Sequence, residues 1–158
     1  MKSKLNLPPY SFTVRRSGNQ KPEILDVYRK KYVTLTPEEW VRQNFLRFLV
    51  EERGYPVSLI AVEKGLVVNR QPKRFDAVVY GSDGMPWMLL EFKSSDVAIT
   101  QKVFEQIALY NQLLKVNFLV VSNGMNHYAC KVDFESGEIV FLKEIPHYQQ
   151  LQEEYRRR

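Results

Sequence analysis

Three charged residues near the middle of the chain have the types and the spacing of a hydrolytic site. Glu91 and Lys93 lie two residues apart in one apolar segment, and Asp76 lies in the apolar segment before it. Side chains two positions apart on a β-strand project from the same face, so Glu91 and Lys93 are expected side by side. Residues 81–84 predict a hairpin turn between the two segments, which places Asp76 opposite Glu91.

The chemistry that fits such a group is metal-assisted attack on a phosphate. Two carboxylates on one face repel each other unless a cation lies between them, and oxygen ligands without histidine favour Mg²⁺ or Mn²⁺. Lys93 is then placed to orient or deprotonate the nucleophile and to offset the charge that builds on the phosphate. An acid-x-Lys tripeptide is also typical of a surface ion pair, but the apolar residues on both sides favour a position near the core.

A helix that begins at Thr36 carries a third candidate acid. Thr36 is a favourable N-cap, Pro37 suits the first helical position, and Glu39 completes a capping box. On a helical wheel Glu38 falls near the centre of the apolar face, whereas Glu39 lies roughly 100° away. We therefore expect Glu38, and not Glu39, to reach inward; the alternative is that Glu38 only serves the helix dipole.

A second helix, expected over residues 99–114, carries an amide and a phenol one turn apart. Gln106 borders its apolar stripe, and Tyr110 lies inside the stripe. We expect this pair to hold a phosphate or to brace Lys93; the alternative for Tyr110 is a place in the core.

Hydrophobic periodicity and turn residues predict an α/β (α+β) fold. The expected order is α-β-β-β-α-β, followed by a β-hairpin and a C-terminal helix after Pro146. Antiparallel hairpins joined through a helical crossover to another strand imply a mixed central sheet flanked by helices. The predicted helices before Pro146 span residues 36–53 and 99–114, and the predicted strands span 57–63, 74–80, 87–93, 117–122, 127–133 and 139–142.

The composition excludes several classes of protein. The chain has 158 residues, of which 44% are hydrophobic, with one cysteine and two histidines. So few of these residues exclude an internal disulfide and a Cys/His zinc module. No apolar run approaches the roughly 18 residues of a membrane span, and the start lacks the apolar core of a secretory signal, so we expect a cytoplasmic protein without membrane contact. No Gly-x-x-x-x-Gly-Lys-Ser/Thr phosphate loop is present, which predicts no ATP motor.

The positive charge is concentrated at the N-terminus. Residues 1–31 carry a net charge of +6, whereas the remainder carries −1. We interpret residues 1–35 as a basic N-terminal arm, extended apart from a short helical turn near 24–28, and residues 36–158 as a single domain. Such an arm is typical of contacts with phosphates, and a solubilising tail is the alternative.

These residues together resemble the PD-(D/E)xK nuclease superfamily. The likeness rests on Asp76, on Glu91-Phe92-Lys93, on an upstream helical Glu and on Gln106-x-x-x-Tyr110. Four segments more specifically resemble the N-terminal nuclease domain of type I restriction enzyme R subunits, in its short stand-alone bacterial form. The resemblance covers residues 29–145, and the four segments are 29–33, 35–43, 74–76 and 122–124.

The resemblance implies a restriction-endonuclease-like core, with residues 36–158 as a nuclease-like domain. It implies that Asp76 and Glu91 bind Mg²⁺ or Mn²⁺, and that the Phe92 carbonyl is a further ligand. Phe75 stands where the name of the superfamily has proline, a position that carries no chemistry. The other implied roles are Lys93 as the catalytic lysine, Glu38 as an auxiliary acid, and Gln106 with Tyr110 as an accessory pair.

The implied function is that of a Mg²⁺-dependent DNA endonuclease, which hydrolyses a phosphodiester bond. The expected partners are DNA, a second copy of the chain, and subunits of a restriction-modification or repair system. Two alternatives stay open: a non-catalytic nucleic-acid-binding or interaction module with the same fold, and a metal-dependent hydrolase that acts on RNA or nucleotides. The basic residues expected to contact the DNA backbone are Arg29, Lys30, Lys31, Lys73 and Arg74.

Overall fold

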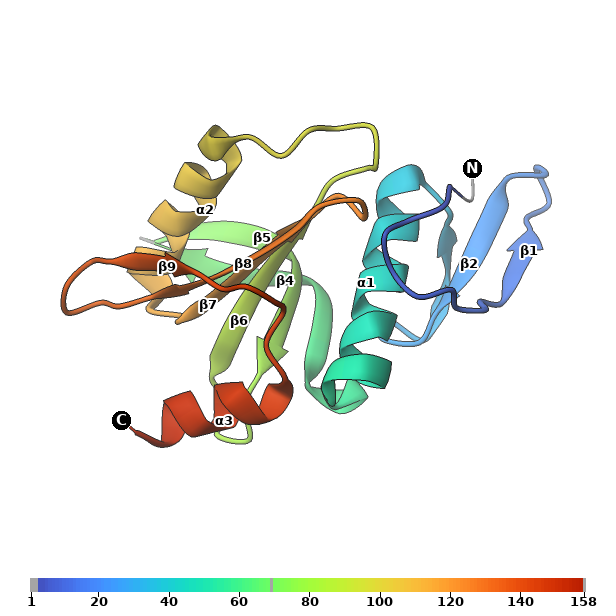
Figure 1. The fold of residues 1–158 in the computed structure, drawn as a ribbon. Helices are drawn as coiled ribbons and strands as arrows, with labels where there is room; N and C mark the ends of the chain where they lie inside the picture. The colour runs from blue at the N-terminus through green and yellow to red at the C-terminus, as the bar shows by residue number, and fades with distance from the viewer. Residues whose placement is uncertain (1–2, 69, 158) are drawn as a thin grey trace.

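A six-stranded mixed sheet forms the centre of the molecule (Figure 1). The computed structural model describes residues 3–68 and 70–157, without the side chains of residues 110, 112 and 113. The strands of this main sheet are β4 (Ile60–Val68), β5 (Gln71–Tyr80), β6 (Pro86–Phe92), β7 (Phe118–Ser122), β8 (His127–Val132) and β9 (Ile139–Phe141). They lie side by side in this order; β6 and β7 run parallel, and the other neighbours run antiparallel.

Three helices cover the two faces of the main sheet: α1 (Pro37–Arg53), α2 (Gln101–Leu114) and α3 (Tyr148–Arg156). Helices α1 and α3 share one hydrophobic cluster with Met88 and Leu90 of β6. Helix α2 packs in a second cluster with Leu89, on the opposite face. Because α2 crosses from the end of β6 to the start of β7, these two strands are parallel. The predicted mixed sheet, its flanking helices and the order of the elements are confirmed.

The residues before α1 form a sheet of their own, which corrects the prediction of an extended arm with a helical turn. Strands β1 (Val14–Arg16), β2 (Pro22–Asp26) and β3 (Lys31–Thr34) lie beside α1, on the side away from the main sheet (Figure 1). Strand β2 occupies the place of the expected helical turn, and its Ile24 is fully buried. The prediction failed because strands of three to five residues show little periodicity, and tertiary contacts decide their pairing.

Strand β4 begins later than its sequence pattern predicts. Residues Val57–Leu59 form a 3₁₀ turn, and the strand covers Ile60–Val68 instead of residues 57–63. Pairing with β5 starts where Ile60 meets Val79. The partner strand, and not the local apolar run, therefore sets the boundary.

Helix α1 begins and ends where its sequence predicts. The Thr36 Oγ1 accepts a hydrogen bond from the Glu39 backbone N–H at 3.0 Å, and Gly54 ends the helix with φ of 72°. The expected capping box is incomplete, because the Glu39 carboxylate accepts hydrogen bonds from Arg42 and Gln43, and the Thr36 N–H donates to the backbone of the preceding strand.

Gly81 makes room for the Trp87 ring near the β5–β6 turn. A Cβ at position 81 would lie 1.9–2.5 Å from atoms of that ring, which stacks on Tyr155 of α3 with 4.7 Å between the ring centroids. We expect Gly81→Ala to displace the indole and to lower the free energy of unfolding by about 1–3 kcal/mol. Gly65→Ala is the matched control, since nothing lies within 4 Å of its added Cβ. Urea denaturation measures both, and equal stabilities would contradict the packing argument.

Candidate active site

Strands β5 and β6 bring Asp76 and Glu91 together. The register pairs Ala77 with Leu90, so Asp76 and Glu91 occupy the next position along the hairpin. The Asp76 Oδ2 accepts the backbone N–H of Phe92 at 2.7 Å, and the Glu91 carboxyl is close enough to share a hydrogen bond with the Asp76 carboxyl. The two acids are therefore neighbours near the C-terminal end of β6.

The surroundings of Glu91 favour its neutral form. Burial, the charge of Asp76 and the hydrogen bond between the two carboxyls raise the pKa of Glu91 to about 8, although Lys73 lies close enough to lower it in part. Two adjacent carboxyls that are partly removed from water do not both ionise readily. The pair therefore keeps a proton near neutral pH unless a cation takes its place.

Phe92 and Lys93 follow Glu91 where β6 lies beside the end of β7. The Lys93 N–H donates to the Ser122 carbonyl at 2.9 Å, so the contact with β7 continues one residue beyond β6. Lys93 is half-buried. The ring of Phe92 packs on Phe45 of α1, with 5.5 Å between centroids, so only the backbone of Phe92 is available to the acids. Crevices at the carboxyl ends of parallel strands are frequent ligand sites in α/β proteins.

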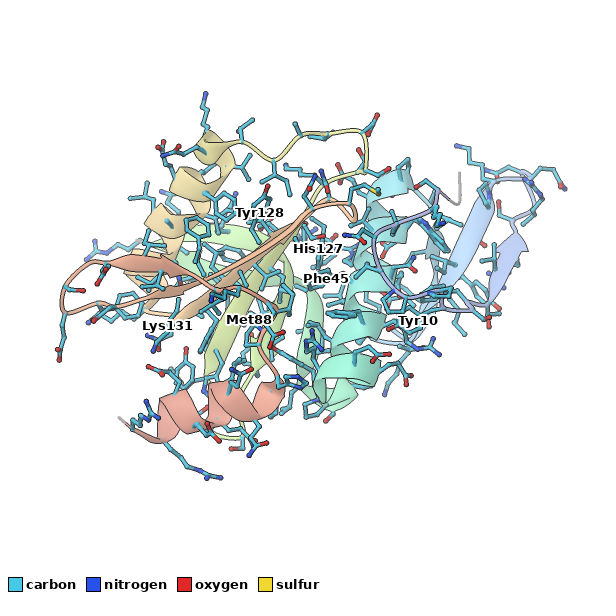
Figure 2. All side chains as sticks on the ribbon, viewed as in Figure 1. Tyr10, Phe45, Met88, His127, Tyr128 and Lys131 are labelled. Atoms are coloured by element: carbon cyan, nitrogen blue, oxygen red, sulfur yellow. The ribbon has the colours of Figure 1, made fainter. Side chains whose placement is uncertain are left out.

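The loop after β7 holds the segment that follows Lys93. Asn123 donates from Nδ2 to the Val97 carbonyl at 2.8 Å. Ser122 Oγ bonds to His127 Nδ1 at 2.7 Å, and the His127 ring lies against Phe45 of α1 (Figure 2). The hydrogen bond from Asn123 therefore holds the segment between β6 and α2 against the end of β7. His127 of β8 connects β7 with α1, because it bonds to Ser122 and packs on Phe45.

The structure reverses the expectation for the two acids at the start of α1. Glu38 is exposed, whereas Glu39 is buried, with 5% of its surface accessible. A helical wheel gives the direction of a side chain around the axis, but it does not show what covers that side chain. Glu39 is covered by Arg29 and Arg42, which a wheel does not anticipate. The role of Glu38 as an auxiliary acid stays a prediction.

Glu39 is the centre of a buried ionic network between the N-terminal sheet and α1. Its carboxylate accepts hydrogen bonds from Arg29 Nη2 at 2.7 Å, Arg42 Nε at 3.0 Å and Gln43 Nε2 at 2.9 Å. Burial acts to raise the pKa of Glu39, but these bonds outweigh it and hold the pKa below its ordinary value. Arg29 also pairs with the buried Asp26. Its guanidinium thus binds two carboxylates of the protein, which argues against the predicted contact with DNA.

Arg42 carries this network to the strand that holds Asp76. Its Nη1 donates to Glu63 Oε1 at 2.6 Å and to the Asp76 carbonyl at 3.3 Å. Glu63 has φ of 55°, a left-handed conformation that costs a residue other than glycine about 1–3 kcal/mol. The β4–β5 register omits the pair of Glu63 with Asp76, although the pairs on either side of it are present. The strained residue therefore lies opposite Asp76.

Most of the other predicted site residues whose side chains are described lie on the surface. Gln106 is exposed on α2, and the side chain of Tyr110 lies outside the described residues. Lys73 lies near Glu91 in the site itself. The exposed members of the predicted basic set are Lys30, Lys31 and Arg74.

The carboxylate pair fits a hard divalent cation. In the part of the chain that the structure describes, no group of three or more His, Cys, Asp or Glu side chains is arranged to hold a metal ion. Mg²⁺, however, is commonly held by one or two carboxylates, with water and substrate phosphate in the other positions. Asp76 and Glu91 supply two such oxygen donors. Burial and the charge of Asp76, which raise the pKa of Glu91, are costs of ionising Glu91 that a cation would offset. The pair therefore suits Mg²⁺ or Mn²⁺.

Sequence reasoning missed Glu39, Arg42 and Glu63. Glu39 and Arg42 have the i, i+3 spacing of an ion pair on a helix, which is a weak signal for part of the network. No local pattern indicates that Glu63 adopts a left-handed conformation. Its contact with Arg42 joins residues 21 positions apart, so only the folded chain shows it.

Comparisons with known proteins agree with this architecture. A solved structure described as a fragment of an HsdR subunit of a type I restriction enzyme from Vibrio vulnificus YJ016 has a TM-score of 0.55 and 20% identity over 75% of this chain. The fold is that of a restriction-endonuclease-like domain. The family model of the type I restriction enzyme R protein N terminus matches residues 37–146. The chain belongs to this family.

Other comparisons are more distant. The match covers 25% of the length of the HsdR fragment. A structure of a DrdV–DNA complex aligns with a TM-score of 0.45 and 15% identity, over 75% of this chain and 12% of the other. A search of the curated proteins finds no match.

In the described residues, no helix has the length and apolar character needed to cross a bilayer.

Glu91 should make the metal-free protein less stable as the pH rises. Its pKa is raised from 4.5 to about 8 in the folded chain, so between these values the folded chain keeps a proton that the unfolded chain has released. The free energy of unfolding then falls by up to about 1.4 kcal/mol per pH unit. Glu91→Gln should remove this dependence. Urea denaturation with EDTA, between about pH 5 and about pH 8, measures both proteins.

In wild type and in Glu91→Gln alike, His127 makes the free energy of unfolding rise with pH, opposite to the effect of Glu91. Burial lowers its pKa from 6.5, so the unfolded chain binds the proton more readily and stability rises with pH in that region. This contribution is common to wild type and Glu91→Gln, so the difference between the two curves isolates Glu91. Parallel curves would contradict a proton held by the carboxyl pair.

Proposed function

We propose that this chain is a Mg²⁺-dependent DNA endonuclease that hydrolyses a phosphodiester bond. The observation that carries the proposal is the half-buried pair of Asp76 and Glu91, whose repulsion a divalent cation would relieve. Membership in the family of type I restriction enzyme R protein N-termini supports a nuclease and supports DNA as its substrate.

Each residue near the pair has a task that its position permits. Asp76 and Glu91, with the Phe92 carbonyl, would hold Mg²⁺ or Mn²⁺, which when bound supplies Lewis-acid stabilisation to the phosphate. Lys93 orients the attacking water and stabilises the negative charge that develops on the phosphate. Lys73, beside Glu91, adds a second positive charge to the site.

Accessory contacts are proposed for residues that a nucleic acid can reach. Glu38 and Gln106 are exposed, and they remain the proposed auxiliary acid and accessory amide, with Tyr110 as the partner of Gln106. Lys30 of the β2–β3 turn, Lys31 at the start of β3 and Arg74 of β5 are exposed and suit contacts with the DNA backbone. Such contacts hold the duplex without reading its sequence.

We propose a cytoplasmic restriction-modification or repair system as the setting, with other subunits of that system as partners. A second copy of the chain would supply the second site that cutting both DNA strands requires. Residues 1–158 contain no phosphate-loop motif. Movement along DNA driven by ATP would therefore depend on a motor outside these residues.

Nicking of supercoiled plasmid DNA tests the proposed function. We expect wild type to nick the plasmid with Mg²⁺ or Mn²⁺ and to stop in EDTA. Asp76→Asn and Glu91→Gln each remove the charge of one ligand at nearly constant volume, and Lys93→Met removes the amine. Each change should lower the nicking rate by about 10²-fold or more.

Glu153→Gln is the matched control for the acids, because Glu153 is an exposed acid on α3. It should nick like wild type. Wild type that cuts nothing with either ion, yet binds DNA with a salt-dependent affinity, would contradict the enzyme and favour a non-catalytic binding module. Cleavage of RNA or nucleotides without cleavage of DNA would favour the other hydrolase.

Replacing Arg29 should affect stability, whereas replacing Lys30 and Lys31 should affect DNA binding. Replacing Lys30 and Lys31 with Ala should weaken DNA binding and reduce the slope of log K against log salt concentration by about 2. Arg29→Ala should instead lower the free energy of unfolding by about 3 kcal/mol, because it leaves Asp26 buried without its ion pair. Fluorescence anisotropy and urea denaturation measure the two effects. Normal stability with weakened DNA binding in Arg29→Ala would place Arg29 on the DNA.

A further inference from the structure

Arg42 of α1 contacts the backbone of the residue proposed to bind the metal. Its side chain is 9% exposed and binds through all three guanidinium nitrogens. Nε donates to Glu39 Oε2 at 3.0 Å and Nη2 to Glu39 Oε1, while Nη1 donates to Glu63 and to the Asp76 carbonyl. One guanidinium thus joins a helix to two neighbouring strands. The flat, forked shape of the group allows this, and a lysine ammonium does not reproduce it.

The two strand contacts of Arg42 meet at an irregular point of the sheet. Glu63 is left-handed, with φ of 55°, and the ladder omits its pairing with Asp76. A left-handed glutamate needs outside contacts to hold it, and the 2.6 Å bond from Arg42 is such a contact. The Asp76 carbonyl opposite Glu63 accepts its bond from the same nitrogen. Arg42 therefore fixes both sides of the irregular pair.

We propose that Arg42 is a positioning residue for Asp76. It holds Glu63 and the Asp76 carbonyl in place, so that the Asp76 carboxylate faces Glu91 and accepts the Phe92 N–H. The inference rests on the proposed metal site, which it deepens: the affinity of Asp76 and Glu91 for the cation depends on a guanidinium that does not touch the cation.

Glu39 sets the direction of Arg42. The Glu39 carboxylate binds Nε and Nη2 of the guanidinium, and it is itself held by Arg29 and Gln43. This leaves Nη1 directed at the strands. The turn between β2 and β3, which supplies Arg29, thus has an indirect part in the geometry of the site.

Arg42→Lys is the central variant, and two observations measure its effect. The first is Mn²⁺ affinity, measured by calorimetry at near-neutral pH. The second is the amide resonance of Phe92 in the ¹H–¹⁵N spectrum of the metal-free protein, which reports on its bond to Asp76 Oδ2. We expect a loss of Mn²⁺ affinity of about 10–100-fold, as for groups that orient metal ligands, together with a shifted Phe92 resonance.

Arg47→Lys is the matched control, because Arg47 forms an exposed ion pair with Glu51 on the same helix. It should change neither observation. Combining Arg42→Lys with Glu63→Gly should restore part of the lost Mn²⁺ affinity, because glycine adopts the left-handed conformation without outside support. Should Arg42→Lys not fold, Glu63→Ala removes the acceptor of one of its strand contacts and should show the same two changes.

Wild-type Mn²⁺ affinity and an unchanged Phe92 resonance in Arg42→Lys would overturn the inference. Failure of the proposed function is a separate result: wild type would then bind no Mn²⁺. In that case the Phe92 resonance still decides whether Arg42 positions Asp76, since it is measured without metal. A shifted resonance would keep the positioning role of Arg42, and an unchanged one would remove it.

Discussion

The close placement of the partly buried Asp76 and Glu91 carboxyls is the constraint that the surrounding residues of the site must satisfy. The β5–β6 register places both acids at the same level of one hairpin. The Phe92 N–H, the nearby Lys73 and a proton retained by Glu91 reduce the cost of this arrangement. The proposed divalent cation would replace this proton and bind one oxygen of each carboxyl group.

The elements around the Asp76–Glu91 pair hold the C-terminal end of β6 in place against β7. The α2 crossover sets β6 parallel to β7, and the Lys93 N–H extends their contact past the end of β6. Helix α1 packs on the main sheet through apolar residues such as Phe45, but its first turns carry buried ions. Buried ions are tolerated when they are paired; here Asp26, Arg29, Glu39, Arg42 and Glu63 form one connected series. The N-terminal sheet is attached to α1 through that series.

Strand periodicity and turn residues in the sequence predicted the part of the site that one β-hairpin forms. A period of two residues placed Glu91, and the turn at residues 81–84 placed Asp76 against it. The caps of α1 were equally local, with Thr36 before the helix and Gly54 after it. The prediction that Glu38, and not Glu39, reaches inward was wrong, because Arg29 of the β2–β3 turn and Arg42 cover Glu39. The short strands β1–β3 and the left-handed Glu63 also depend on distant contacts, which one sequence does not display.

Binding of Mn²⁺ to the wild-type protein, followed by electron paramagnetic resonance, is the most direct test of the proposed metal site. The signal of the free ion falls as the protein takes it up, so the measurement needs no substrate and no assumption about activity. We expect one saturable site for Mn²⁺ in wild type. Asp76→Asn and Glu91→Gln should each abolish it, and Mg²⁺ should compete for it. Absence of saturable binding by wild type, or equal binding by both variants, would contradict a metal site formed by this carboxyl pair.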